Sequence, residues 1–365
     1  MPLRAPVVAV TGLNATDNPG PGVAVVRSLR ADPEFTGSIV GLVYDALEPG
    51  LYMPGLLDAA FLMPYPSAGR AALLERLDHV RQRVGLDVLI PTLDSELPAL
   101  VGQEAQLEAM GIRTCLPSPA QLEARSKARL HELAIDHGLP VPASVVLTDV
   151  EGVYRLHEQL EGPVVVKGVF YGARVCHSVD EAVRAFHAVA AEWGLPVVVQ
   201  RLVQGEEVNV CAVGDGAGGL VGAVPMKKRM LTSQGKGWAG VTIIDDALMA
   251  LTTDFMRATH WRGPCELEAR KQADGRLHLI EINPRFPAWC DLTAGAGQNL
   301  PAAVLRLALG DDPRPLSGYR VGTAFVRISL DQIVDISALE AITTRGEVLP
   351  GDPLKLPANA LPLEL

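Results

Sequence analysis

An Asp-Gly pair between two apolar-rich runs constrains this chain more than any other feature. Asp274-Gly275 separates residues 263–270 from residues 277–285. Such a pair is a strong signal for a two-residue β-hairpin, because a type I′ turn needs positive φ at both central positions. The sequence therefore predicts an antiparallel hairpin in which Ala273 pairs with Arg276.

That register brings acidic side chains face to face. Counting outward from the turn places Glu268 opposite Glu281, and it places Glu266 opposite Asn283. The alternation of a strand puts Arg285 on the same face as Glu281. Like charges directly opposite each other destabilise a sheet, so a divalent cation between the two glutamates would explain the pair. The alternative is a solvated hairpin with scattered charge, but an acid inside Leu-Ile-Glu-Ile-Asn has to be paired or metal-bound.

Residues 1–120 alternate short apolar segments with amphipathic stretches, which is typical of a parallel sheet with crossover helices. The pattern predicts a Rossmann-like unit. Its expected strands are Val7–Thr11, Ile39–Tyr44, Ala60–Met63 and Val88–Ile90. Its expected helices are Val23–Leu29, Ala68–Val84 and Leu97–Met110.

The loop after the first strand invites a dinucleotide interpretation. Residues 11–22 contain several glycines, and Asp45 follows the second strand. The glycine spacing is not Gly-x-Gly-x-x-Gly, however, and the loop is too long for a tight phosphate turn. A dinucleotide-dependent oxidoreductase is therefore an alternative and not the main hypothesis.

Composition restricts the class of protein. The 365 residues are 48% apolar and 20% charged, which describes a globular protein with sizeable cores. A formal net charge of −10 argues against a nucleic-acid surface, and no apolar run approaches the length of a membrane span. The five cysteines are widely spaced and lack a Cys-x-x-Cys pair, which indicates reduced core residues and a cytoplasmic location.

Four motifs occur in order along the middle of the chain. They are Ser126-Lys127 with the following Gly138-Leu-Pro-Val-Pro142, Gly162-Pro-Val-Val-Val-Lys167, the segment Pro196–Asn209, and Glu281-Ile-Asn-Pro-Arg285. Together they resemble the ATP-grasp superfamily. The resemblance implies an α/β chain of the α+β ATP-grasp type. It implies a Rossmann-like domain at 1–118, an ATP-grasp lid and linker at 119–204, and a C-terminal ATP-grasp domain with the metal site at 205–365.

The resemblance also assigns roles to residues. Lys127, on a helix, and Lys167, at the end of a strand, would contact the triphosphate of ATP, although either could be a surface lysine. The adenine and ribose contacts would come from Gln200, the backbone near Leu202 and Val203, and Glu207, with Glu206 as the alternative to Glu207. The metal ligands would be Glu268, Glu281 and Asn283, holding one or two Mg²⁺ or, alternatively, Mn²⁺.

Two segments near these motifs carry further candidates. Arg285 would stabilise charge on the transferred group, and Lys236, in a glycine-rich loop, would contact phosphate or carboxylate, with Lys228 and Arg229 as rivals. The phosphate-covering loop after Lys167 is shorter than in relatives, so Arg174 or Tyr171 is a candidate for part of the covering.

The N-terminal unit would contribute to the substrate side. Its candidates are Asn14, Asp17, Asn18 and the stretch Asp94-Ser-Glu96, and ordinary turn chemistry is the alternative for all of them.

The predicted activity is ATP-dependent carboxylate–amine ligation through an acyl phosphate, with release of ADP and phosphate. The expected partners are small carboxylate and amine substrates resembling amino acids, with no nucleic acid and no membrane, and the resemblance implies a homodimer. The alternatives are a carboxylase or carbamoyl phosphate-type enzyme that uses bicarbonate, and a nucleotide-binding module without catalysis.

Overall fold

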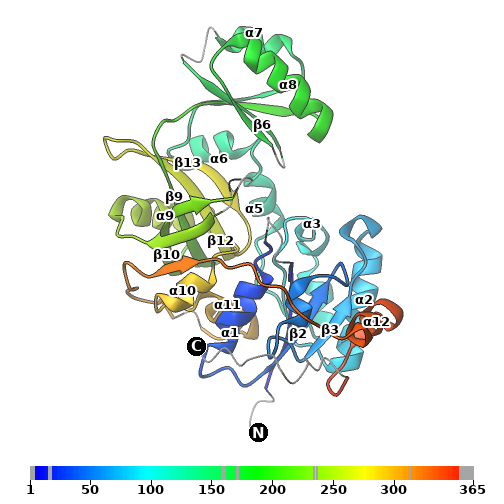
Figure 1. The fold of residues 1–365 in the computed structure, drawn as a ribbon. Coiled ribbons are helices and arrows are strands. Elements are labelled where there is room, and N and C mark those ends of the chain that lie inside the picture. Colours follow the sequence, from blue (N-terminus) through cyan, green and yellow to red (C-terminus); the bar gives the residue numbers. More distant parts are fainter. Residues whose placement is uncertain are drawn as a thin grey trace.

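Three β-sheets organise the protein. The computed structural model describes residues 5–14, 19–157, 162–169, 172–232, 235, 237–312 and 314–352. A four-stranded sheet lies at one end of the molecule, a six-stranded sheet in the middle and a five-stranded sheet at the other end (Figure 1). This is the mixed α/β class expected from the sequence.

The five-stranded sheet has the order β15-β3-β2-β1-β4, with the first four strands of the chain in parallel. Buried apolar side chains cover both of its faces, as expected for a sheet covered by helices on both sides. One buried cluster joins the sheet to α1 and another joins it to α2. The elements are β1 (Val7–Thr11), β2 (Ser38–Val43), β3 (Ala59–Leu62), β4 (Val88–Ile90), α1 (Gly22–Arg30), α2 (Arg70–Val84), α3 (Leu97–Leu100) and α4 (Glu104–Ala109), with 3-10 turns at Pro49–Tyr52 and Pro66–Ala68.

The predicted elements of this unit lie where the sequence placed them, with one exception. The single helix expected at Leu97–Met110 is wrong, since α3 ends at Leu100 and α4 begins at Glu104. Gly102 between them has φ +82°, a left-handed conformation that no helix interior accepts.

The four-stranded sheet is antiparallel, in the order β5-β8-β6-β7. Helices α7 and α8 share its buried aliphatic cluster. Two short helices, α5 and α6, precede this sheet in the chain (Figure 1). The elements are α5 (Pro119–Ala124), α6 (Leu130–His137), β5 (Ser144–Leu147), α7 (Glu151–His157), β6 (Val164–Gly168), β7 (Ala173–Cys176), α8 (Val179–Trp193) and β8 (Val197–Arg201).

The six-stranded sheet is antiparallel, in the order β13-β12-β9-β10-β11-β14. Side chains on one face pack against α6 and α9, and part of the other face packs against α10 and α11. The elements are β9 (Glu206–Asp215), β10 (Leu220–Leu231), β11 (Gly237–Thr242), α9 (Asp246–Thr259), β12 (Arg262–Lys271), β13 (Leu277–Asn283), α10 (Asp291–Gly295), α11 (Leu300–Leu309) and β14 (Ala324–Val326).

The β12–β13 hairpin has the predicted pairing at its functional end but a different turn. Glu268 pairs with Glu281 and Glu266 with Asn283, as predicted. The predicted two-residue turn is wrong, because the backbone N–H of Gln272 bonds Arg276, which leaves a three-residue loop with Gly275 at φ +86°. A bulge between Glu268 and Ala269 then restores the register.

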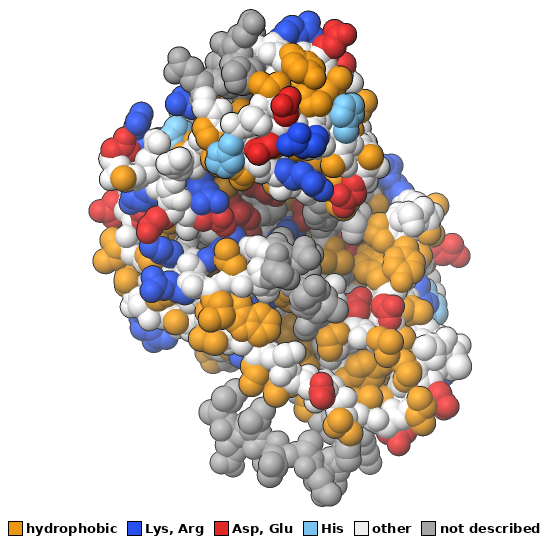
Figure 2. All heavy atoms as spheres, turned by 45° about the horizontal axis from the view of Figure 1, so that its top comes forward, with side chains coloured by type: hydrophobic (Ala, Val, Ile, Leu, Met, Phe, Trp, Pro, Cys, Tyr) orange, Lys and Arg blue, Asp and Glu red, His pale blue; other side chains and the backbone are white. Residues whose placement is uncertain are grey.

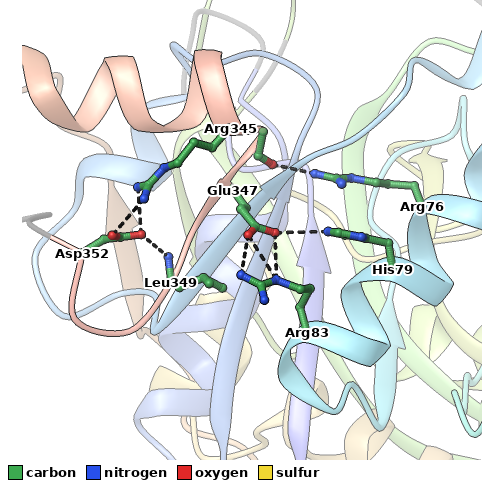
Figure 3. A network of polar contacts seen from close by, with 8 residues as sticks. Arg76, His79, Arg83, Arg345, Glu347, Leu349 and Asp352 are labelled. Carbon is green, nitrogen blue, oxygen red and sulfur yellow. Dashed lines mark hydrogen bonds and ion pairs between the residues drawn. The ribbon is translucent and has the colours of Figure 1, made fainter.

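The chain returns to the five-stranded sheet after β14. Helix α12 (Ile336–Arg345) leads into β15 (Glu347–Val348), which pairs antiparallel with β3. Figure 3 shows how side chains secure this return: Glu347 accepts hydrogen bonds from Arg83 at 2.7 Å and pairs with His79 at 3.1 Å, and Asp352 accepts from Arg345 at 2.9 Å. Part of the segment assigned to the C-terminal domain thus contacts the N-terminal sheet, and the domain division itself stays a prediction.

No helix among the described residues is long and apolar enough to cross a membrane.

Candidate functional site

The candidate site lies on one face of the six-stranded sheet, where β9, β12 and β13 run side by side. Residues directly opposite each other in antiparallel strands share a face. Pairing therefore puts Asn209, Glu268 and Glu281 in one row, and it puts Glu266 and Asn283 in the next. Acidic and basic side chains gather around a hollow beside the four-stranded sheet (Figure 2).

Lysine side chains compensate the two facing carboxylates. Glu281 Oε1 lies 3.4 Å from the Nζ of Lys127, and Glu268 Oε2 lies 3.8 Å from the Nζ of Lys228. The side chains of Glu268 and Glu281 are 18% and 31% exposed, so this face is not the solvated hairpin that was the alternative. The two carboxylates repel each other without these cations.

The predicted metal ligands suit a hard cation. Asn283 Nδ2 donates to Glu268 Oε1 at 3.0 Å, so the amide and one carboxylate are in contact. Glu281, on β13, lies directly opposite Glu268 on β12. Within the described ranges no three His, Cys, Asp or Glu side chains form a metal-binding group. Two carboxylates and an amide nevertheless provide the oxygen ligands that Mg²⁺ accepts together with water and phosphate.

The two predicted phosphate lysines converge on the same region from different elements. Lys167 lies in β6, as predicted, whereas Lys127 lies in the turn between α5 and α6 and not in a helix. Lys167 Nζ donates to Gln200 Oε1 at 2.7 Å. Burial lowers the pKa of Lys167 to about 8, while Glu281 opposes that shift and Lys127 adds to it.

The predicted adenine contacts have partners already. The Gln200 amide accepts from Lys167 and donates to Ser144 Oγ at 3.0 Å. The backbone N–H of Leu202 donates to Pro163 at 2.9 Å. A ring edge at this hinge would therefore meet the carbonyl of Leu202 and the backbone of Val203.

Of the two adjacent acids on β9, Glu207 is the more buried. Its side chain is 25% exposed, against 65% for Glu206. Glu207 Oε1 accepts from Lys228 Nζ at 2.5 Å, and Glu207 Oε2 lies 3.3 Å from Arg270. This arrangement favours Glu207 over Glu206 for the predicted ribose contact.

Arg285 joins the site to the N-terminal unit. Its Nε donates to Asp94 Oδ2 at 2.7 Å, and its Nη1 donates to the backbone oxygen of Phe286 at 3.1 Å. Burial lowers the pKa of Arg285, but Asp94 and Glu266 outweigh burial and raise it. The other predicted charge contact, Lys236, lies outside the described residues, as does Tyr171. Arg174 is exposed on β7.

No role was predicted for Glu266, a buried acid at the centre of the site. Glu266 Oε1 accepts from Trp289 Nε1 at 2.7 Å and from Asn209 Nδ2 at 3.0 Å, and its Oε2 accepts from Asn283 Nδ2 at 3.1 Å. Burial and then Glu268 raise its pKa to about 7. The available signal was an acid inside the apolar run Gly263-Pro-Cys-Glu-Leu.

A second missed residue is Arg327, which follows β14. Its guanidinium donates to the backbone oxygen of Ala288 at 2.8 Å and lies 5.6 Å from the ring centroid of Phe325. Burial lowers its pKa. Ala288 lies three residues after Arg285, so this cation contacts the segment that follows Arg285.

The N-terminal candidates have structural roles in part. Asn14 Oδ1 accepts from the backbone of Gly20, which is the turn chemistry considered as the alternative. Glu96 is buried and accepts from Thr11 and Tyr44 at 2.5 and 2.6 Å. Asp17 and Asn18 lie outside the described residues. Asp94 contacts Arg285, which lies two residues after β13 of the six-stranded sheet.

Comparisons with known proteins agree with this fold. Residues 195–324 match the family described as "ATP-grasp in the biosynthetic pathway with Ter operon". The D-alanine–D-alanine ligase of Chromohalobacter salexigens is 28% identical over 250 residues, which cover 61% of this chain and 78% of that protein. The phosphoribosylamine–glycine ligase of Synechocystis sp. is 30% identical over 141 residues, 37% of this chain and 32% of that protein.

Solved structures show the same fold at low identity. The biotin carboxylase domain of Hydrogenobacter thermophilus 2-oxoglutarate carboxylase, solved with MgADP and bicarbonate, has a TM-score of 0.67 at 19% identity, covering 87% of this chain and 73% of that one. The L-amino acid ligase of Bacillus licheniformis has a TM-score of 0.62 at 17% identity, covering 84% and 75%.

These findings define an ATP-grasp fold, and residues 195–324 match an ATP-grasp family, in agreement with the resemblance of the sequence motifs. The two curated relatives named above are both ligases.

Proposed function

We propose that the protein is an ATP-dependent carboxylate–amine ligase that forms an amide through an acyl phosphate. The observation that supports this most is the facing pair Glu268 and Glu281, with Asn283 beside them and the phosphate-binding candidates Lys127 and Lys167 on neighbouring elements.

The nucleotide would lie between the four-stranded and six-stranded sheets. Lys127 and Lys167 would bind its phosphates, because each ammonium group is already held among carboxylate or amide oxygens that phosphate oxygens can replace. The backbone at Leu202 and Val203 would contact adenine, and Glu207 the ribose hydroxyls.

Glu268, Glu281 and Asn283 would hold one or two Mg²⁺, which would neutralise charge on the phosphates of ATP. The reaction then takes place between the substrates, with protein residues stabilising the charge that develops. A substrate carboxylate oxygen attacks the γ-phosphorus, and the bond to ADP breaks. Arg285 stabilises the negative charge at the transferred group.

An amine nitrogen then attacks the acyl carbon, the carbon–oxygen bond to phosphate breaks, and the nitrogen loses a proton to solvent. Arg327 is the candidate for holding a carboxylate of the acceptor, since its guanidinium borders the segment after Arg285. Amino acids are the proposed substrates.

Bicarbonate is the second candidate acid. The biotin carboxylase domain with TM-score 0.67 was solved with bicarbonate and is described as a dimer. The same phosphoryl transfer would then produce carboxyphosphate. We propose in addition a homodimer and a cytoplasmic location, the latter because all five cysteines are free and buried.

The test is ADP release from ATP·Mg against a matrix of carboxylic acids, amino acids and bicarbonate, with mass spectrometry of each positive mixture. ADP release that requires both an acid and an amine would support ligation and identify both substrates. Release with bicarbonate alone would favour carboxylation. ATP binding without ADP release in every mixture would contradict the ligase and favour the non-catalytic module. Replacing Mg²⁺ with Mn²⁺ tests the metal preference.

A further inference from the structure

We infer that Asp94 is a positioning residue through which the N-terminal unit orients Arg285 for phosphoryl transfer. The inference rests on the proposed function. Asp94 follows β4, at the carboxyl end of the parallel strands, where α/β sheets place their functional loops.

The contact between Asp94 and Arg285 is short and partly covered. The Nε–Oδ2 distance is 2.7 Å, and the side chains of Arg285 and Asp94 are 16% and 21% exposed. A guanidinium is a planar group with donors in fixed directions. Because Asp94 holds Nε and the oxygen of Phe286 holds Nη1, the plane of the Arg285 guanidinium is fixed. Asp94 therefore helps to determine the direction of the remaining N–H groups of Arg285.

The loop that carries Asp94 is itself rigid. Glu96 Oε1 accepts from the backbone N–H groups of Thr92 at 2.8 Å and Leu93 at 2.9 Å, and the Thr92 hydroxyl donates to the backbone oxygen of Thr11 at 2.8 Å. Residues on either side of Asp94 are thus tied to β1. This explains why the sequence has buried Glu96 two residues after Asp94: it holds the loop from which Asp94 reaches the site.

Asp94 also contacts the segment that carries Lys127. Its Oδ1 lies 3.5 Å from the guanidinium of Arg125, two residues before Lys127. Lys127 in turn pairs with Glu281, which lies on the same strand as Asn283. The carboxylate of Asp94 therefore contacts Arg285 and also Arg125, in the segment that carries Lys127.

A second ion pair in the molecule provides a matched comparison. Asp32, after α1, pairs with Arg306 in α11 at 2.6 Å, and its side chain is 11% exposed. This pair also joins the N-terminal unit to an element that packs on the six-stranded sheet, but within the described part of the chain neither residue contacts the candidate site. If Asp94 merely joined the two parts of the molecule, removal of either aspartate charge would have the same effect.

The experiment compares Asp94→Asn with Asp32→Asn in the full chain. We expect Asp94→Asn to lower kcat for ADP release about ten- to a hundredfold, as loss of an orienting partner does, while the KM for ATP changes less than about twofold. Asp32→Asn should leave kcat within about twofold and change the Tm as much as Asp94→Asn does. Equal kcat for the two variants, or a loss confined to KM, would overturn the inference.

A double-mutant cycle separates action through Arg285 from a direct effect. In an Arg285→Lys background, Asp94→Asn should lower kcat less than about twofold, because the group it orients is already gone. An undiminished loss in that background would contradict a positioning role.

A measurement without turnover distinguishes failure of this inference from failure of the proposed function. The Nε–H of Arg285, followed by NMR of arginine side chains, should be protected from exchange in the wild-type protein and in Asp32→Asn, and exposed in Asp94→Asn. If no acid or amine supports ADP release but this protection is lost only in Asp94→Asn, the ligase proposal fails and the contact stands. Unchanged protection in Asp94→Asn would overturn the inference whatever the activity.

Discussion

Glu96, which follows β4 of the five-stranded sheet, and Glu266, in β12 of the six-stranded sheet, are both buried carboxyl groups, and their surroundings differ. Hydroxyl and backbone N–H groups surround Glu96, and all of its partners belong to the same unit. Glu266 accepts from Trp289, Asn209 and Asn283, and charged side chains lie around it.

This difference indicates that Glu96 is buried to stabilise the fold, whereas Glu266 is buried as part of the candidate site. The partners of Glu96 hold strand ends and a loop in place, and burial raises its pKa. Around Glu266 the charges of Glu268, Lys228 and Arg285 all contribute to its pKa, which means that several ionic groups share one small volume. Such a volume can rearrange its ionic contacts when a ligand with its own charges enters, whereas Glu96 is held by hydroxyl and backbone N–H groups.

The largest expected effect is the loss of ADP release when a carboxylate of the candidate site is removed. Glu281→Gln removes one of the two facing carboxylates, and we expect ADP release to fall by about a hundredfold or more, as loss of an electrostatic contact in a phosphoryl-transfer site does. The Tm should change little. Glu347→Gln, which removes a carboxylate paired with Arg83 far from the site, is the matched control and should retain full activity. ADP release by Glu281→Gln at the wild-type rate would refute the metal assignment.

Removal of the Glu96 carboxylate should lower stability and leave nucleotide binding unchanged. Glu96→Ala leaves the hydroxyls of Thr11 and Tyr44 without their acceptor, so we expect a loss of about 3 kcal/mol in the free energy of unfolding. Urea unfolding followed by circular dichroism measures this loss. Nucleotide affinity of the folded variant should stay close to that of the wild type. A stable variant with lost ATP binding would remove the distinction drawn between the two glutamates.

A smaller effect is expected on the affinity for ATP, which should depend on pH through Lys167. Its pKa of about 8 means that the ammonium loses its proton as the pH rises through 8, and a neutral amine binds phosphate poorly. Since bound phosphate retains the proton, the affinity for ATP should fall by about tenfold between pH 7 and pH 9. Lys167→Met should bind ATP more weakly and lose most of this dependence. Calorimetric titration at several pH values is the measurement, and an equal pH dependence in wild type and variant would contradict the phosphate contact.

The smallest effect concerns the hairpin loop. Gly275 has φ +86° with open space where a Cβ would lie, so Gly275→Ala adds only backbone strain, about 1 kcal/mol. Gly295→Ala is the control, because Gly295 lies in α10 without positive φ and its Cβ would meet Thr323 at an ordinary 3.9 Å. Thermal unfolding should separate the two variants, with ATP turnover unchanged in both. Equal Tm values would contradict the left-handed loop position.

Much of this arrangement follows from local sequence patterns. The parallel strands and the opposition of Glu268 and Glu281 were predictable, because alternation and turn residues act over a few positions. The correct register came from two errors that cancel, since the loop has one residue more than predicted and the bulge compensates for it. No local pattern distinguishes these two arrangements.

The contacts that complete the site depend on distant parts of the chain. The sequence placed Asp94 and Arg285 in separate units and gave no reason to pair them, since their contact depends on how two sheets pack. The hydrogen bonds of Glu266 to Trp289 and Asn209 are of the same kind. Long-range tertiary packing determines these neighbours, and no periodic pattern in the sequence indicates which residues will meet.

The pairing of β15 with β3 has a consequence for synthesis of the chain. Strands β1 to β4 emerge from the ribosome early, but the strand that covers the edge of β3 is made only after both other sheets. Until then the backbone groups along that edge lack a partner and can pair with a strand from another chain. We therefore expect fragments that stop before residue 347 to aggregate more readily than the whole protein, even though they contain the first four parallel strands.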